Sequence, residues 1–415
     1  MLKTLSIPLD LPEFHIINQL INKDCYIAEV KKDSSAERCP YCGFLTQNIH
    51  DYRTRMVRDL PIFTKPLYLK VQINRFRCKN CNEVFSQAFE SIHPGQHQTI
   101  RYREYLYKQC NGSTIQKVSK EQKIAYSTLE RIYYSNADAE IHKQQRDQRI
   151  QAILQEEVTV IGIDEIAVRK GHTYETVLVD LVHGGVLGMT HERSYESAAQ
   201  LLKIHPVLSQ ATIQTIVVDM WDPFHKAIHK VLPSAMIVID KYHVIQKVTQ
   251  ALDQVRKKLQ SEQKNLKKKR LLFLMSLEKL SDKQKIRLDE LLDDCPDLAH
   301  AYYLKELFRT IYHAPTRDYA NEQLLLWIDE AKKSPFKPFH QVANMMRNWF
   351  DKILNYFDCK VTNARTEGTN HRIKNIKRRA YGYRNLHRFR TRVMLECTGL
   401  ERDRDFIDWL DQVAV

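Results

Sequence analysis

The sequence predicts a multidomain α/β protein, and three observations carry that prediction. Two Cys-x2-Cys pairs lie in the first hundred residues, apolar strand patterns alternate with helical ones from 158 to 240, and helical periodicity continues from 244 to about 357. A chain of 415 residues has the length of two to four domains, each able to bury its own core. With only 11 glycines, the chain is not a collagen-like or glycine-linker protein.

Charge and hydropathy narrow the class of partner. The 64 Lys and Arg against 50 Asp and Glu leave a net charge of +14, which favours a polyanion such as DNA or RNA without distinguishing a polymerase, a repressor and a ribosomal protein. No apolar run approaches the roughly 20 residues of a membrane span, so we expect no membrane. The first twenty residues lack a secretory pattern, and the cytoplasm is the expected compartment.

The first 90 residues are predicted to contain a zinc ribbon. Its four ligands would be Cys39, Cys42, Cys78 and Cys81, because two C-x2-C turns supply the four thiolates of a tetrahedral structural zinc site. The alternating apolar residues of 66–77 predict a half-buried strand between the pairs. The alternative is four cysteines buried as small apolar residues. Five arginines, at 53, 55, 58, 75 and 77, would face either phosphates or solvent.

A helix-turn-helix is predicted within 91–150, with an ordinary helical hairpin as the alternative. Val118 opens a short helix, and Ser127 to Glu130 reads as a capping box at the start of a second helix, which would run to about Tyr134. The second helix of such a motif enters the DNA major groove, so Ser127, Thr128 and Arg131 are the candidate DNA contacts. Lys123 occupies the turn position where glycine is usual.

The region from 158 to 240 has the element order of a known fold. Strands are expected at 158–168, 174–182, 186–190, 213–219 and 236–240, with a helix at 194–204. The order β-β-β-α-β-α-β, with Asp164 in the first strand and Asp219 ending the fourth, is typical of ribonuclease-H-like nucleotidyl transferases, although several α/β folds share parts of it. Asp164 in a buried strand is predicted to be either a metal ligand or a buried partner of an Arg or Lys.

A third acid is needed if two divalent metals are to share one phosphate. Glu367 is the best candidate, because it falls in the first turn of a helix starting near Asn363, where the helix dipole favours its ionised form. On the same face follow the basic residues His371, Lys374 and Arg378. The alternative is a capping glutamate that neutralises neighbouring arginines.

These motifs together resemble, in their order along the chain, the DDE transposases of bacterial insertion sequences in the ISL3 family. The resemblance rests on the two cysteine pairs, the helix-turn-helix, Gly162-Ile-Asp-Glu165, Val217-Val-Asp-Met220, Asp240-Lys-Tyr-His243 and 363–374. It implies a catalytic triad of Asp164, Asp219 and Glu367 holding Mg²⁺ or Mn²⁺, with Asp240 and His243 in support and zinc as a structural ion.

The same resemblance implies what the protein does. It would bind double-stranded DNA at transposon ends and at the target, cleave and transfer strands, and work as a homo-oligomer associated with the nucleoid. Two other functions share parts of the pattern: a zinc-containing regulator with a degenerate nuclease fold, and a nuclease without strand transfer.

The spacing of the acids predicts an insertion. Asp240 and Glu367 are 367 − 240 = 127 residues apart, whereas a bare core needs a helix or two there. We therefore expect an all-helical insertion at 244–357 that divides the catalytic domain into 151–243 and 358–415. Trp349 and Phe350 are expected to pack in its core.

Overall fold

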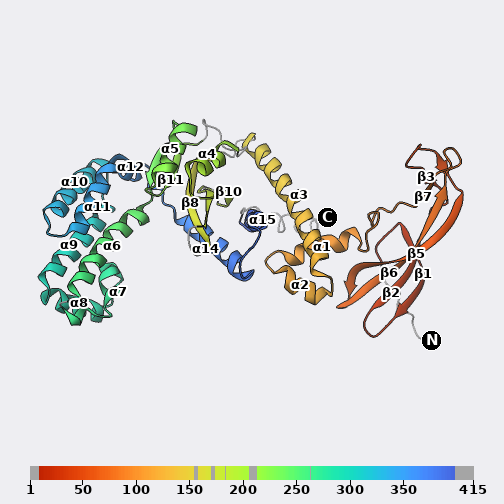
Figure 1. Ribbon diagram of the computed structural model, residues 1–415, viewed down its shortest axis with the longest axis horizontal. Helices are drawn as coiled ribbons and strands as arrows, with labels where there is room; N and C mark the ends of the chain where they lie inside the picture. The colour runs from red at the N-terminus through yellow and green to blue at the C-terminus, as the bar shows by residue number, and fades with distance from the viewer. Residues whose placement is uncertain are drawn as a thin grey trace. The chain divides into compact units, whose positions relative to one another are not determined.

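The computed structural model describes residues 9–153, 158–169, 173–182, 184–204, 213–261 and 263–397. It divides the chain into two compact units, Met1–Ala139 and Glu140–Val415 (Figure 1). The last part of the predicted catalytic domain, 398–415, lies outside the described residues.

The first unit begins with a sheet of order β1-β2-β6-β5, in which β7 also pairs with β6. These strands are β1 (Phe14–Ile21), β2 (Tyr26–Lys32), β5 (Ile49–Ile62), β6 (Lys65–Arg77) and β7 (Val84–Ser86). Only β2 and β6 pair in parallel; the other pairs are antiparallel. Leu67, Leu69 and Val71 of β6 are buried between half-exposed neighbours, which confirms the strand predicted at 66–77.

Three helices follow: α1 (Ile100–Cys110), α2 (Ile115–Gln122) and α3 (Tyr126–Ile153). α2 ends at Lys123, whose φ of 51° and ψ of 45° give the left-handed turn that glycine usually supplies. The prediction for α3 was wrong in two respects. The helix starts at Tyr126, so Ser127 lies within its first turn and does not cap it, and it runs well beyond residue 134.

A buried carboxylate attaches α1 to the sheet. Asp59 of β5 is fully buried and accepts hydrogen bonds from Thr99 Oγ1 at 2.7 Å and Arg101 Nε at 2.9 Å. Next to it, Arg58 Nη1 donates to the backbone oxygen of Gln122 at the end of α2, at 2.6 Å. Arg58 therefore holds the helices against the sheet and does not face phosphate or solvent freely, as was considered for it from sequence.

The second unit contains a five-stranded sheet of order β10-β9-β8-β11-β12. The strands are β8 (Val160–Arg169), β9 (Thr173–Asp180), β10 (Val186–His191), β11 (Thr215–Val218) and β12 (Met236–Ile239). The first three form an antiparallel meander, whereas β8, β11 and β12 run parallel. Helix α4 (Tyr195–Ile204) lies between β10 and β11 in the chain, and α5 (Asp222–Val231) lies between β11 and β12. This confirms the predicted order of elements.

Helices cover both faces of this sheet (Figure 1). Ile161 and Ile163 of β8 pack with α4 and α5, and the opposite face packs with α14 (Ala364–Arg379) and α15 (Leu386–Glu396). Consecutive residues of β9 and β11 alternate between the two cores, as the pleat requires. The sheet is therefore the middle layer of three.

Between β12 and α14 the chain is helical, as predicted. The helices are α6 (Lys241–Leu259), α7 (Arg270–Leu274), α8 (Asp282–Asp293), α9 (Pro296–Ile311), α10 (Arg317–Lys333), α11 (Lys337–Asn348), α12 (Phe350–Leu354) and α13 (Tyr356–Cys359), with 3-10 turns at Lys264–Leu266 and Leu277–Lys279. Trp327, Phe308 and Phe339 are buried at their centre. Trp349 and Phe350 pack against this core, as predicted. None of the helices described could cross a bilayer.

Gly162 lets α14 approach β8 closely. A Cβ at this buried position would lie 2.6 Å from both Asn363 Oδ1 and Thr366 Oγ1, two side chains that are themselves buried. Gly368, on the same helix, has nothing within 4 Å of the corresponding position.

We expect Gly162→Ala to lower the free energy of unfolding by about 1–3 kcal/mol, because neither buried side chain can move aside. Gly368→Ala is the matched control, expected to raise it by up to about 1 kcal/mol through helix propensity. Denaturant unfolding of the two variants measures both values. A neutral Gly162→Ala would show that α14 is not held against β8 in this way.

Candidate functional site

Three aspartates lie side by side where the parallel strands meet α14. Val218 of β11 pairs with Ile163 of β8 and with Ile239 of β12, so the next residues, Asp219, Asp164 and Asp240, follow in register. The pleat turns all three to the face that α14 covers, because Gly162, Val217 and Val238, two residues earlier, face it.

Asp164 is joined to α14 by a hydrogen bond. Asn370 Nδ2 donates to Asp164 Oδ2 at 2.6 Å, and the backbone N–H of Glu165 donates to Oδ1 at 2.8 Å. Burial raises the pKa of Asp164, and the neighbouring charge of Asp219 adds to that rise. Of the two roles considered for Asp164, a buried Arg or Lys partner is absent among the described contacts.

Two basic side chains, Arg193 and His243, lie among the acids. Arg193 lies 3.0 Å from Glu165 Oε1 and 3.8 Å from Asp219 Oδ2, and its guanidinium stacks on Trp221 at 4.1 Å. His243 Nδ1 lies 3.5 Å from Asp219 Oδ2. Arg193 was missed from sequence because it follows β10 and only the folded sheet brings it to Asp219.

Asp240 is almost fully buried at the end of β12. Its Oδ1 accepts the backbone N–H of Asn363 at 3.1 Å, and its Oδ2 lies 3.9 Å from His243 Nε2 with no hydrogen bond in the described part of the chain. Burial raises the pKa of Asp240. The structure thus places His243 between Asp219 and Asp240.

His225 of α5 fixes the backbone at Asp219. Burial lowers the pKa of His225 to about 4, so the ring is neutral at pH 7, and its Nε2 lies 2.9 Å from the backbone oxygen of Asp219. Its ring rests on Trp349 with centroids 4.3 Å apart. His225 was also missed, since a histidine inside an amphipathic helix carries no local signal of its partner.

Glu367 lies in the first turn of α14, exposed, as predicted for the helix start. It lines a cavity of about 430 Å³ together with Asp240, Lys241 and Arg309. Within the described chain it makes no hydrogen bond or ion pair to Asp164 or Asp219. Asn370, about one turn further along, is the α14 residue that reaches the aspartates.

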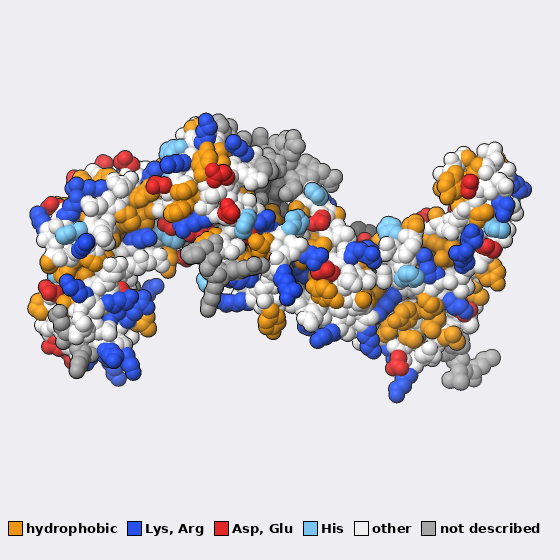
Figure 2. Space-filling model, viewed as in Figure 1, with side chains coloured by type: hydrophobic (Ala, Val, Ile, Leu, Met, Phe, Trp, Pro, Cys, Tyr) orange, Lys and Arg blue, Asp and Glu red, His pale blue; other side chains and the backbone are white. Residues whose placement is uncertain are grey.

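The basic residues of α14 divide into two sets. His371, Lys374 and Arg378 are exposed on the face that begins with Glu367, roughly 120° around the helix from its buried face. Others are used inside the fold: Lys377 Nζ donates to the backbone oxygen of Ala167 at 3.0 Å, and Arg379 pairs with Glu396 at 2.5 Å. On the face shown in Figure 2, Lys and Arg spread over many elements and do not gather in one patch.

The acidic residues are of the type that binds a divalent cation, although the oxygens of the described acids do not all lie close enough together to hold one ion. Carboxylate oxygens are the ligands that Mg²⁺ and Mn²⁺ favour. Asp240 Oδ2 and Glu165 Oε2 are buried without a hydrogen bond among the described residues, and burial raises the pKa of Glu165 to about 7. A cation would offset the burial, and secondarily the repulsion, that raise the pKa values of these carboxyls.

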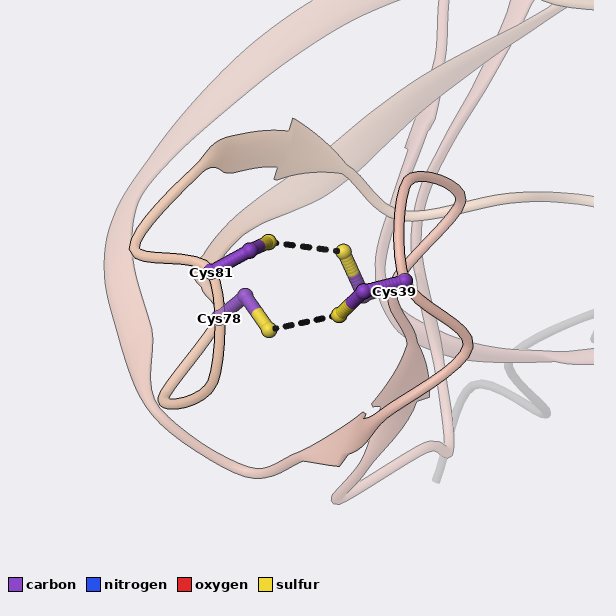
Figure 3. A group of neighbouring side chains, drawn as sticks. Cys39, Cys78 and Cys81 are labelled. Carbon is purple, nitrogen blue, oxygen red and sulfur yellow. Dashed lines mark hydrogen bonds between the residues drawn. The ribbon is translucent and has the colours of Figure 1, made fainter.

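Four cysteines form a second site in the first unit (Figure 3). The Sγ atoms of Cys39, Cys42, Cys78 and Cys81 all lie within 4.8 Å of one another. Cys39 lies 3.6 Å from Cys81, and Cys42 lies 3.5 Å from Cys78, so each turn faces the other. Hydrogen bonding, first from the backbone of Phe44, lowers the pKa of Cys42 to about 6, which favours the thiolate that binds zinc.

The two cysteine turns have the same backbone. The N–H of the residue four positions after the first cysteine, Gly43 or Asn82, donates to that cysteine's oxygen at 2.9 or 3.0 Å. Both residues have positive φ, 74° and 63°, which suits glycine and asparagine. The repeated geometry explains why two short sequence pairs predict one four-ligand site.

On α3, Ser127 and Arg131 are exposed and Thr128 is half-buried. Their opposite face packs inward through Leu129, Ile132 and Tyr133. The candidate DNA contacts therefore lie on the solvent-facing side of α3.

We expect removal of zinc by a chelator, or Cys78→Ser, to disorder the cysteine turns while leaving the sheet core of Val30, Leu69 and Val71 folded. Metal analysis should find one zinc in the wild type and in Cys25→Ser, whose cysteine lies outside the cluster, and less in Cys78→Ser. Equal zinc content in all three proteins would contradict the assignment.

Comparison with known proteins identifies the family. Residues 161–393 match the ISL3-type DDE family described as "Transposase", and residues 35–81 match the zinc finger of transposases IS204/IS1001/IS1096/IS1165. The transposase for insertion sequence element IS1001 of Bordetella parapertussis is 26% identical over 381 residues, covering 90% of this chain and 92% of the relative. The transposase for IS1557 of Mycobacterium tuberculosis is 23% identical over 267 residues, covering 58% and 60%.

The four clustered cysteines and the matched zinc finger agree on a structural zinc site. The family model spans more than half of the chain and includes all three aspartates, Glu367 and the helical insertion. The chain belongs to the ISL3 family of DDE transposases.

Proposed function

We propose that this chain is the transposase of an insertion sequence, and that Asp164, Asp219 and Glu367 are its catalytic residues. One observation carries the assignment: α14, which bears Glu367, is attached to Asp164 by Asn370 beside an in-register row of aspartates. The attachment supports a site that draws its acids from two chain segments separated by the helical insertion.

The α/β unit is proposed to be ribonuclease-H-like. Its strand order puts the first strand in the middle, with the antiparallel meander on one side and two parallel strands on the other. That order supports the fold inferred from the sequence, and the two opposite cores on its faces suit a sheet covered by helices on both sides.

In the proposed mechanism some residues bind the metal ions and others position the metal-binding groups. Asp164, Asp219 and Glu367 would hold Mg²⁺ or Mn²⁺, which supplies activation of the attacking oxygen and stabilisation of the leaving one. Asn370 orients the Asp164 carboxylate, and His225 fixes the backbone at Asp219. His243, between Asp219 and Asp240, limits the repulsion within the row.

DNA recognition is proposed to use two surfaces. α2 and α3 would form a helix-turn-helix that reads the terminal inverted repeats through Ser127, Thr128 and Arg131. The left-handed Lys123 supports this over an ordinary hairpin, because it supplies the tight turn without glycine. His371, Lys374 and Arg378 would bind phosphates near the catalytic site.

Transposition joins two DNA ends to a target, so we further propose a homo-oligomer assembled on double-stranded DNA at the nucleoid. A nuclease without strand transfer would share the acidic site, and the joined product distinguishes the two. A regulator with a degenerate nuclease fold would need neither the aligned aspartates nor Asn370 directed at one of them.

We expect Asp164→Asn, Asp219→Asn and Glu367→Gln each to reduce Mg²⁺-dependent cleavage and joining by roughly 10³-fold or more, because each removes a metal-binding carboxylate. Cleavage of a DNA fragment carrying the ends of the element measures the effect, and DNA affinity should change little. Asp318→Asn, at an exposed acid in the first turn of α10, is the control and should cleave normally. Unimpaired cleavage by Glu367→Gln alone would remove Glu367 from the triad.

The two DNA surfaces should respond differently to salt and sequence. Lys374→Ala is expected to weaken binding to all sequences and to reduce the slope of log affinity against log salt concentration by about 0.9, one phosphate contact. Arg131→Ala should instead lose about 1–3 kcal/mol of preference for the element's ends. Titrations with end and unrelated DNA at several salt concentrations separate these outcomes; identical behaviour of the two variants would contradict the division.

A further inference from the structure

The turn between α14 and α15 holds an exposed tyrosine in an unfavourable backbone conformation. Tyr381 is 99% exposed and has a φ of 54°. Its N–H donates to Arg378 O at 2.9 Å, and the N–H of Gly382 donates to Lys377 O at 3.0 Å, so Tyr381 occupies the helix-terminating position that glycine normally takes. A bulky residue with positive φ is strained there.

The Tyr381 side chain stabilises neither the turn nor the hydrophobic core. Tyr383, two residues on, packs against Phe389 with ring centroids 5.2 Å apart, whereas the Tyr381 ring makes no ring contact among the described residues. A strained residue with a fully exposed aromatic ring is better explained by an external ligand with a flat apolar face than by folding.

The surroundings of Tyr381 are cationic. The exposed face that starts at Glu367 continues through Lys374 and Arg378 to the turn, and exposed Arg384 follows it. Other arginines of the region are engaged in the fold: Arg365 donates to the Leu181 oxygen at 3.1 Å. The cations left exposed therefore mark a path for a polyanion from the acidic site to the ring.

The length of that path gives a position on DNA. Fourteen residues separate Glu367 from Tyr381, and a helical rise of about 1.5 Å per residue makes this about 21 Å. At about 3.4 Å per base step, the distance corresponds to about six base pairs.

We propose that Tyr381 stacks on a DNA base that has left its paired stack, about six base pairs from the phosphate that reacts beside Glu367. This rests on the proposed function and adds a contact to it: the cations bind the backbone, and the ring binds the face of an unpaired base. Aromatic stacking is tolerant of sequence, because every base offers a flat face.

The test compares two DNA probes and three variants. One probe is a duplex with an unpaired 2-aminopurine about six base pairs from a 3′ end, and the other is the same duplex fully paired. Tyr381→Gly removes the ring and relieves the positive φ, so it should unfold no more easily than the wild type. Tyr381→Phe keeps the ring, and Tyr319→Ala removes an exposed tyrosine of α10 as the control.

We expect Tyr381→Gly to lose roughly 5- to 100-fold in affinity for the unpaired probe and to lose the fluorescence quenching of 2-aminopurine, with binding of the paired duplex unchanged. Tyr381→Phe and Tyr319→Ala should match the wild type on both probes.

Equal losses on both probes, or none with Tyr381→Gly, would overturn the stacking role. Failure of the proposed function gives a different result: normal cleavage by Asp164→Asn would overturn the catalytic site, whatever Tyr381 does. Loss of quenching in Tyr319→Ala as well would also overturn the proposal, because the contact would then not be specific to this turn.

Discussion

The catalytic unit depends on two hydrogen bonds that join segments far apart in the chain. Asn370 donates to Asp164, and the backbone of Asn363 donates to Asp240, across 206 and 123 residues of sequence. The aspartates repel one another at the edge of a buried sheet, and these bonds hold α14 where it covers them. Gly162 makes the approach possible, because a side chain there would collide with α14. Without this attachment α14 would not be held beside the aspartates.

Much of the architecture was predictable because its signals are local. The strands and helices from 158 to 240 follow from period-two and helical patterns, and both cysteine turns follow from their spacing. The pairing of β2 with β6 was not predictable, since parallel pairing joins strands that no turn connects. The start of α3 was misplaced because Ser127 to Glu130 satisfies the composition of a capping box, while the preceding left-handed turn at Lys123 begins the helix at Tyr126.

The functional site shows more clearly that sequence patterns do not reveal contacts made only on folding. Asp164, Asp219 and Asp240 could be selected from sequence because an acid inside an apolar strand or at its end is conspicuous. Arg193, His225 and Asn370 could not, because each acts through a contact made only in the folded sheet. They share a function: they position or neutralise the acids without being candidates for the chemistry themselves. A search for reactive residues therefore recovers the carboxylates and misses the groups that make a row of neighbouring carboxylates tolerable.

Net charge is a poor measure of the surface available to DNA in this protein. Several cations that the sequence places in basic runs are consumed by folding: Arg58 donates to the end of α2, Arg101 pairs with Asp59, and Lys377 donates to the strand that carries Asp164. Each donates to a backbone carbonyl or a carboxylate within the fold. The remaining exposed cations of α14 lie on one face between Glu367 and Tyr381. Folding thus leaves the exposed positive charge of α14 in a row that runs from Glu367 toward the exposed ring of Tyr381. A strand of DNA passing through the site could lie along this row.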